Sequence, residues 1–215
     1  MVSIKSEGVI LKRRNFSEAD RILTIFTKTQ GKVSVLAKGV RRITSRRAGN
    51  IELLNRVIVF LHQGKGMPIL TEAKAVDTYP NLKNDLTLST YAFHIIELLD
   101  KLLAENQENP ILYGHMVEVL NRLSKKPRQI LIRAFEAKIL SNLGFATFQR
   151  QGVNLIHPRG GSILEELELR PWDEIENMEI NEREALELER ILRYHCEKIL
   201  ENRLNSLTML KRMKN

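Results

Sequence analysis

Residues 21–38 read RILTIFTKTQGKVSVLAK, which is two β-rich runs separated by a Thr-Gln-Gly turn. In the second run Val33, Val35 and Ala37 alternate largely with polar neighbours, the period-two pattern of a strand with one buried face. Gly31 closes the turn, because glycine accepts the positive φ that a tight hairpin requires. The stretch therefore predicts a β-hairpin.

Further β-rich runs occupy residues 7–12, 56–61 and 67–73, and the last two flank the glycine turn at 63–66. Short strands arranged as an open sheet would expose unpaired edges, so closure into a small barrel is expected. We predict a five-stranded OB-type β-barrel over residues 1–80.

After Pro80 the apolar residues recur every three or four positions, which indicates helices. We expect one helix from residue 82 to 102 with Asn81 as its N-cap, and a second beginning at Pro110. A third begins at Pro127 and ends in a left-handed cap at Gly144. The last begins near Asn181, whose partner Glu184 completes a capping box.

The stretch 149–164 is punctuated by Pro158, Gly160 and Gly161, and we predict a small β-hairpin insert with 158–161 in its turn. The predicted fold class is thus α+β. An OB-type nucleic-acid-binding domain over 1–80 precedes an α-helical domain over 81–215 that carries the insert.

The composition excludes several classes of protein. With 43% hydrophobic and 28% charged residues among 215, the chain is globular. One cysteine can form neither an internal disulfide nor a thiolate zinc site. No apolar run approaches the ~20 residues that span a bilayer, and Lys5 and Glu7 stand where a signal peptide needs an apolar core. We expect a cytoplasmic protein with no membrane partner.

The positive charge is concentrated at one end of the chain. Residues 1–80 hold 15 Lys or Arg and 6 Asp or Glu, a net charge of +9, whereas the remaining residues hold 19 and 20. Such asymmetry indicates a nucleic-acid-binding module beside a neutral one, although an excess of lysine for solubility is the alternative explanation.

The run 38–50 holds five cations and no anion between two predicted strands. Guanidinium forks suit phosphate oxygens, and OB-folds hold single strands with loops of this kind. A solvated surface loop or a flexible insert would have the same composition. The candidate DNA-binding residues, including a weaker run at 12–14, are Lys12, Arg13, Arg14, Lys38, Arg41, Arg42, Arg46 and Arg47. Phe16, beside the weaker run, fits either a stacking ring or the core.

Catalytic and metal-binding motifs are missing from the sequence. None of the five histidines forms an H-x-x-x-H or H-E-x-x-H pair, and there is no phosphate loop. His195 and Cys196 are adjacent on a predicted helix, so they point about 100° apart. We expect no catalysis, no cofactor and no metal. Residues 163–190 hold 11 acidic and 3 basic side chains, either as a solvated face or as a patch that contacts the basic barrel.

Several short sequence motifs, in this order along the chain, resemble those of the RecO family of bacterial DNA repair proteins. The resemblance is specific within the first eighty residues and more diffuse beyond them. The motifs are Glu7–Leu11, Glu18–Thr24, Gly31-Lys32, Ala37–Arg42 with Ser45-Arg46, Gly64–Gly66 and Leu70–Ala73. Looser matches continue through Asn109-Pro110, Leu143–Phe145 and Asn202–Leu207.

The resemblance implies an N-terminal OB-fold and a helical domain that together bind single- and double-stranded DNA. Members anneal complementary strands coated by single-strand-binding protein, and with RecR they help load the RecA recombinase, which places this protein at the bacterial nucleoid. It implies a site for the acidic C-terminal tail of single-strand-binding protein, for which the candidates are Arg122, Lys125, Lys126, Arg128 and Arg133.

The chain departs from many members in one respect, since no cysteine follows Leu143–Phe145 where they carry a four-cysteine zinc module. A non-catalytic recombination mediator is therefore the leading hypothesis. An OB-fold RNA-binding or translation-associated module and a helical scaffold remain the alternatives.

Overall fold

The computed structural model describes residues 2–145 and 158–200. Its strands are β1 (Val2–Phe16), β2 (Asp20–Thr27), β3 (Gly31–Ala37), β4 (Arg56–Gln63) and β5 (Ile69–Asp77). Its helices are α1 (Pro80–Asn84), α2 (Leu86–Leu102), α3 (Pro110–Lys125), α4 (Gln129–Asn142), α5 (Pro158–Leu169), α6 (Trp172–Asn177) and α7 (Glu182–Leu200). They form two compact units, 1–113 and 114–215.

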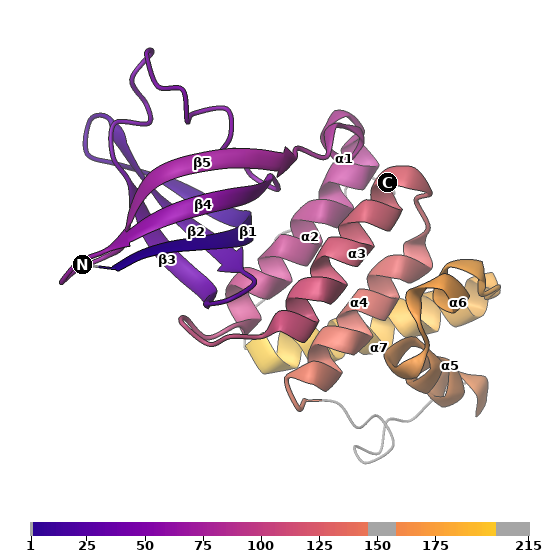
Figure 1. Cartoon of the computed structure of the whole chain (residues 1–215). Coiled ribbons are helices and arrows are strands. Elements are labelled where there is room, and N and C mark those ends of the chain that lie inside the picture. Colours follow the sequence, from indigo (N-terminus) through magenta and orange to yellow (C-terminus); the bar gives the residue numbers. More distant parts are fainter. Residues whose placement is uncertain (1, 146–157, 201–215) are drawn as a thin grey trace. The chain divides into compact units, whose positions relative to one another are not determined.

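The strands of the first unit close into a barrel in the order β1-β2-β3-β5-β4, which confirms the predicted architecture (Figure 1). β1 is long enough to pair with β4 through Val2–Val9 and with β2 through Gly8–Phe16, so it belongs to both halves of the barrel. A parallel contact between Leu36 and Ile69 closes the ring. The alternating apolar residues of all five strands fill its interior, as their period requires.

The predicted turns lie between the strands that they were expected to join. Gly31 has a φ of +67° in the turn between β2 and β3, and Gly64–Gly66 lie between β4 and β5. The main-chain N–H of Asn106 donates to the carbonyl of Lys32 at 2.8 Å, so the segment after α2 packs on the first of these turns.

Helix α2 packs against β1 in the same unit. The ammonium group of Lys32, which is buried, donates to the carbonyl of Asp100 at 2.6 Å. The change from strands to helices occurs at Pro80, but the compact unit extends to residue 113, and the predicted domain boundary at 80/81 stays a prediction. Asp85, rather than the predicted Asn81, caps α2, since its carboxylate accepts from the N–H of Leu88 at 2.8 Å.

In the second unit α4 packs against α5, α6 and α7, and every residue from Ile130 to Leu140 is buried. Gly144 has a φ of +78° after α4, and Asn181 and Glu184 exchange reciprocal bonds of 2.9 Å at the start of α7. Both caps are therefore as predicted.

The predicted β-hairpin insert is wrong over residues 158–164, because α5 begins at Pro158 and continues to Leu169. Proline fits the first turn of a helix, and the buried side chains of Ile163, Leu164 and Leu167 outweigh the low helix propensity of the two glycines. The rest of the proposed insert, 149–157, lies outside the described residues.

Candidate nucleic-acid interface

The cation-rich segment forms a loop of successive turns after β3, and we call residues 38–50 the basic loop. Bonds from the N–H of Arg42 to the carbonyl of Gly39 (3.2 Å) and from the N–H of Ser45 to that of Arg42 (2.9 Å) close two of its turns. A third bond of 3.1 Å joins Asn50 to Arg47. The loop is thus an ordered structure rather than an open excursion of the chain.

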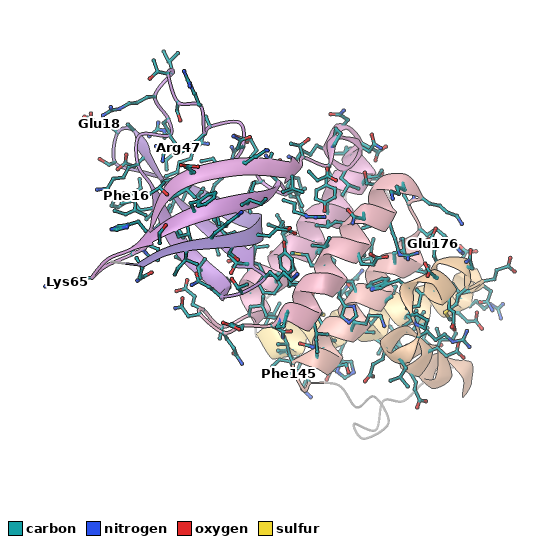
Figure 2. The ribbon with its side chains drawn as sticks, in the orientation of Figure 1. Phe16, Glu18, Arg47, Lys65, Phe145 and Glu176 are labelled. Atoms are coloured by element: carbon teal, nitrogen blue, oxygen red, sulfur yellow. The ribbon has the colours of Figure 1, made fainter. Side chains whose placement is uncertain are left out.

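The first half of the basic loop is tied to the turn between β1 and β2. The carboxylate of Asp20 accepts from the N–H of Gly39 at 2.7 Å, and the carbonyl of Ala19 accepts from the N–H of Arg41 at 2.9 Å. The guanidinium of Arg41 also donates to the carbonyl of Ser17 at 3.2 Å. These bonds place the loop and the residues that follow β1 at one end of the barrel (Figure 2).

Arg47 fastens the second half of the loop to the barrel. Its Nη1 donates to the carbonyls of Leu70 at 2.7 Å and Thr71 at 3.3 Å, and its Nη2 donates to the carbonyl of Lys38 at 2.7 Å. The guanidinium therefore satisfies main-chain acceptors at the start of the loop and on β5. Its fork is occupied inside the protein.

An open hollow of about 620 Å³ lies against the loop. Its lining contains four cations and one carboxylate, which is already bonded to Gly39. The lining residues are Asp20, Lys38, Gly39, Arg42, Thr44, Ser45, Arg46 and Arg47. A surface with this excess of fixed positive charge, with hydroxyl groups between the cations, suits an anion with several oxygen acceptors.

The weaker run on β1 is partly neutralised within the protein. Lys12 approaches Asp100 at 3.4 Å and Arg13 pairs with Glu52, whereas Arg14 is exposed. Among the described residues, the side chains of four candidate cations make no hydrogen bond or ion pair, namely those of Arg14, Lys38, Arg42 and Arg46. Phe16 is 47% exposed, so it does not belong to the core.

Comparison with known proteins identifies the family. The model described as "Recombination protein O N terminal" matches residues 1–79, and "Recombination protein O C terminal" matches residues 83–154. The chain belongs to the RecO family. The resemblance found in the short sequence motifs is thereby confirmed.

Curated relatives of this RecO chain are named DNA repair protein RecO. Those from Acetivibrio thermocellus and Syntrophomonas wolfei are 37% and 34% identical over 145 and 144 residues, each match covering 66% of this chain. The protein from Listeria monocytogenes is 30% identical over 141 residues, or 65% of this chain. The matches span 58%, 58% and 55% of these relatives' own lengths.

The RecO chain's predicted tail-binding cations, at the end of α3 and the start of α4, differ in accessibility. Arg122 bonds to the carboxylates of Glu118, Asp173 and Glu176, which together raise the pKa of its guanidinium against the opposing effect of burial. Arg128 donates to the carbonyls of Glu176 and Met178. Acidic residues of α6 take part in these contacts. This part of the acidic segment 163–190 therefore binds cations of its own unit instead of being wholly solvated.

The remaining candidates are Lys125, Lys126 and Arg133. Lys125 is exposed, and Lys126 is 58% exposed with Glu176 at 3.7 Å. Arg133 is only 4% exposed and pairs at 2.9 Å with the buried Glu136 on the same helix. Arg133 is therefore paired inside the helical unit rather than placed to meet a ligand at the surface.

A partly buried polar cluster that sequence reasoning missed lies in the first unit of this RecO chain. Glu7 accepts from the hydroxyl of Tyr113 at 3.0 Å and pairs with Arg56 at 2.9 Å. Burial raises the pKa of Tyr79 to about 12 and also raises that of Tyr113, so both phenols remain protonated. These residues are far apart in the sequence, and no spacing could have indicated them.

Within residues 2–145 and 158–200, no group of three or more His, Cys, Asp or Glu side chains is placed to hold a metal ion. None of the described helices is long and apolar enough to cross a membrane. Cys196 is buried, and burial raises the pKa of its thiol well above its ordinary value.

Proposed function

We propose that this chain is a non-catalytic recombination mediator that binds single- and double-stranded DNA and anneals complementary strands. With RecR it would help load RecA on DNA coated by single-strand-binding protein, in the nucleoid of a bacterial cytoplasm. The observation that carries the proposal is the fixed basic loop, on which the side chains of Arg42 and Arg46 have no partner among the described residues. Membership of the RecO family supports the repair context.

The eight predicted DNA-binding residues take different parts in this proposal. Direct phosphate contacts come from the four unpartnered cations, Arg14, Lys38, Arg42 and Arg46. Arg41 and Arg47 hold the loop while adding positive potential, and Lys12 and Arg13 add potential that their own ion pairs reduce. Phosphate contacts carry affinity without sequence preference, which suits a protein that anneals any complementary pair.

The salt dependence of binding tests the assignment of these cations. Four neutralised phosphates on a single strand give a slope of about −3 in a plot of log affinity against log salt. The double variant Arg42→Ala/Arg46→Ala should bring this slope to about −1.5, because each lost contact removes about 0.7. Lys28→Ala/Lys65→Ala is the matched control, since it removes two exposed charges from other turns of the barrel. Equal slopes in the two double variants would refute the assignment.

For the protein partner, the proposal places the acidic tail of single-strand-binding protein at the end of α3. Lys125 and Lys126 are its accessible cations there, while Arg122 and Arg128 would have to exchange their bonds with α6 to take part. Arg133 is left out of this contact because it is buried.

An annealing assay on coated strands tests the function itself. A mediator should anneal complementary strands still covered by single-strand-binding protein, and should lose this when the acidic tail is deleted while still annealing naked strands. An RNA-binding module would show neither the tail dependence nor a preference for coated DNA. If the protein binds DNA but never anneals coated strands, the mediator function is refuted and only nucleic-acid binding survives.

Two further measurements concern chemistry. Elemental analysis should detect no stoichiometric zinc, and nucleotide hydrolysis should stay at background. A tightly bound zinc ion in each chain, or turnover above background, would contradict a non-catalytic and metal-free protein.

A further inference from the structure

We propose that Ile43, at the tip of the basic loop, packs against unstacked nucleobases of a single strand whose phosphates are held by Arg42 and Arg46. This rests on the proposed DNA binding and extends it, because the loop would then contact the bases as well as the backbone.

The first argument is the exposure of Ile43. Its relative exposure is 105%, so the side chain packs on nothing in the protein. Val40 and Ile51, the branched apolar residues that flank it in sequence, are 1% and 0% exposed and belong to the core of the barrel. The loop therefore buries its other branched apolar side chains and presents this one to solvent.

The second argument is the local backbone. The bond from the N–H of Ser45 to the carbonyl of Arg42 makes Ile43 and Thr44 the two central residues of a turn. Turn centres favour glycine, proline, asparagine, aspartate and serine, whereas β-branched residues belong in strands. Neither turn preference nor packing accounts for an isoleucine here. A residue that breaks a local rule without a structural gain points to a functional role.

The third argument is rigidity. Arg47 and Asp20 tie the two ends of the loop to the barrel, so the tip is held away from the core. Isoleucine is also restricted about χ1 because it is branched at Cβ. Ile43 therefore meets a ligand with little loss of conformational freedom.

The chemistry of the tip selects the occupant. An apolar side chain lies between two arginine pairs, so the matching ligand alternates fixed anions with apolar surfaces. A single nucleic-acid strand does this at every nucleotide, and a base presents an apolar face whatever its identity. Protein wedges that enter base steps of nucleic acids use the same residue types, isoleucine among them.

The experiment compares a normal thymidine oligonucleotide with an abasic strand of equal length and charge. Wild-type protein and the Ile43→Ser variant are titrated with each strand by fluorescence anisotropy at several salt concentrations. The matched control is Ile111→Ser, which removes an isoleucine that is 64% exposed at the start of α3. Ile43 is fully exposed, so its variant should melt at the wild-type temperature.

We expect Ile43→Ser to weaken binding to the normal strand by about tenfold with an unchanged salt slope, because an apolar contact but no charge is lost. On the abasic strand its affinity should equal that of wild type, and Ile111→Ser should match wild type on both. An equal loss on the two strands, or no loss on either, would overturn the inference. If Arg42→Ala/Arg46→Ala also binds as wild type does, the proposed DNA binding itself fails. If only the arginine variant loses affinity, the base contact alone is refuted.

Discussion

Replacing Arg47 separates its role in holding the loop from its charge. Its two bonds of 2.7 Å reach the carbonyls of Leu70 and Lys38, and a third of 3.3 Å reaches Thr71. A hydrogen bond to a charged group contributes about 1.5–3 kcal/mol, and the partial exposure of Arg47 reduces this to about 1 kcal/mol for each short bond. Loss of both costs about 2 kcal/mol, or about thirtyfold in affinity if DNA binds only the fastened loop.

The two variants Arg47→Ala and Arg47→Lys are therefore compared for affinity and salt slope on a single strand. Lysine keeps the charge but lacks the planar fork that reaches both carbonyls, so Arg47→Lys should still lose about tenfold at an unchanged slope. Limited proteolysis should cut the basic loop faster in both variants than in wild type. If Arg47→Lys instead restores wild-type affinity while Arg47→Ala lowers the slope by about 0.7, Arg47 contacts phosphate directly and the reasoning is refuted.

Three further predictions concern stability. Gly31→Ala should lower the free energy of unfolding by about 3 kcal/mol in a denaturant titration, because φ is +67° and a Cβ would lie 1.8 Å from the carbonyl oxygen of Gln107. The control is Gly66→Ala, since open space surrounds Gly66. Equal effects of the two substitutions would contradict this account. Burial, with a contribution from Lys138, lowers the pKa of His115 below 6.5, so the unfolded chain binds more protons and stability should fall as pH drops below about 6.5. The fluorescence of Trp172, whose indole N–H donates to His115 at 3.1 Å, reports this unfolding, and His115→Gln should flatten the pH dependence. Glu136→Ala should lower the free energy of unfolding by about 3–5 kcal/mol, because it leaves Arg133 buried without its ion-pair partner. The double variant Arg133→Met/Glu136→Leu should be close to neutral, since it removes both charges. Equal losses of stability in the two variants would be inconsistent with a buried ion pair.

The features that could be predicted from the sequence are those whose cause is local. Alternation in residues 32–38 reflects a strand with one face in the barrel, and Gly31 and Gly144 occupy backbone conformations that favour glycine. The capping box at Asn181 and Glu184 needs only neighbouring residues. In each case the residues that determine the structure lie within a few positions of one another.

The features that could not be predicted depend on contacts between distant residues. Pro158 and the glycines after it have the composition of a turn, yet α5 forms because Leu164 and Leu167 are completely buried in the helical unit. The break between α1 and α2 at Asp85 interrupts one continuous apolar period, and Asp85 replaces Asn81 as the cap. The spacing of apolar residues predicts which face of a helix is buried, but it does not predict where the main-chain hydrogen bonds of the helix end.

For the cations, too, the local sequence gives one part of the answer and contacts between distant residues give the other. A sequence shows that residues 1–80 carry a surplus of charge, but the acceptors that use this charge come from elsewhere. Arg47 bonds to a carbonyl 23 positions away, and Arg122 bonds to carboxylates 51 and 54 positions away. The guanidinium groups of Arg42 and Arg46, on the same loop, find no acceptor among the described residues. Under the proposed function, the number of phosphates neutralised is set by the cations that the fold leaves unpaired. A salt slope much steeper than about −3 would mean that DNA displaces the internal partners of the others.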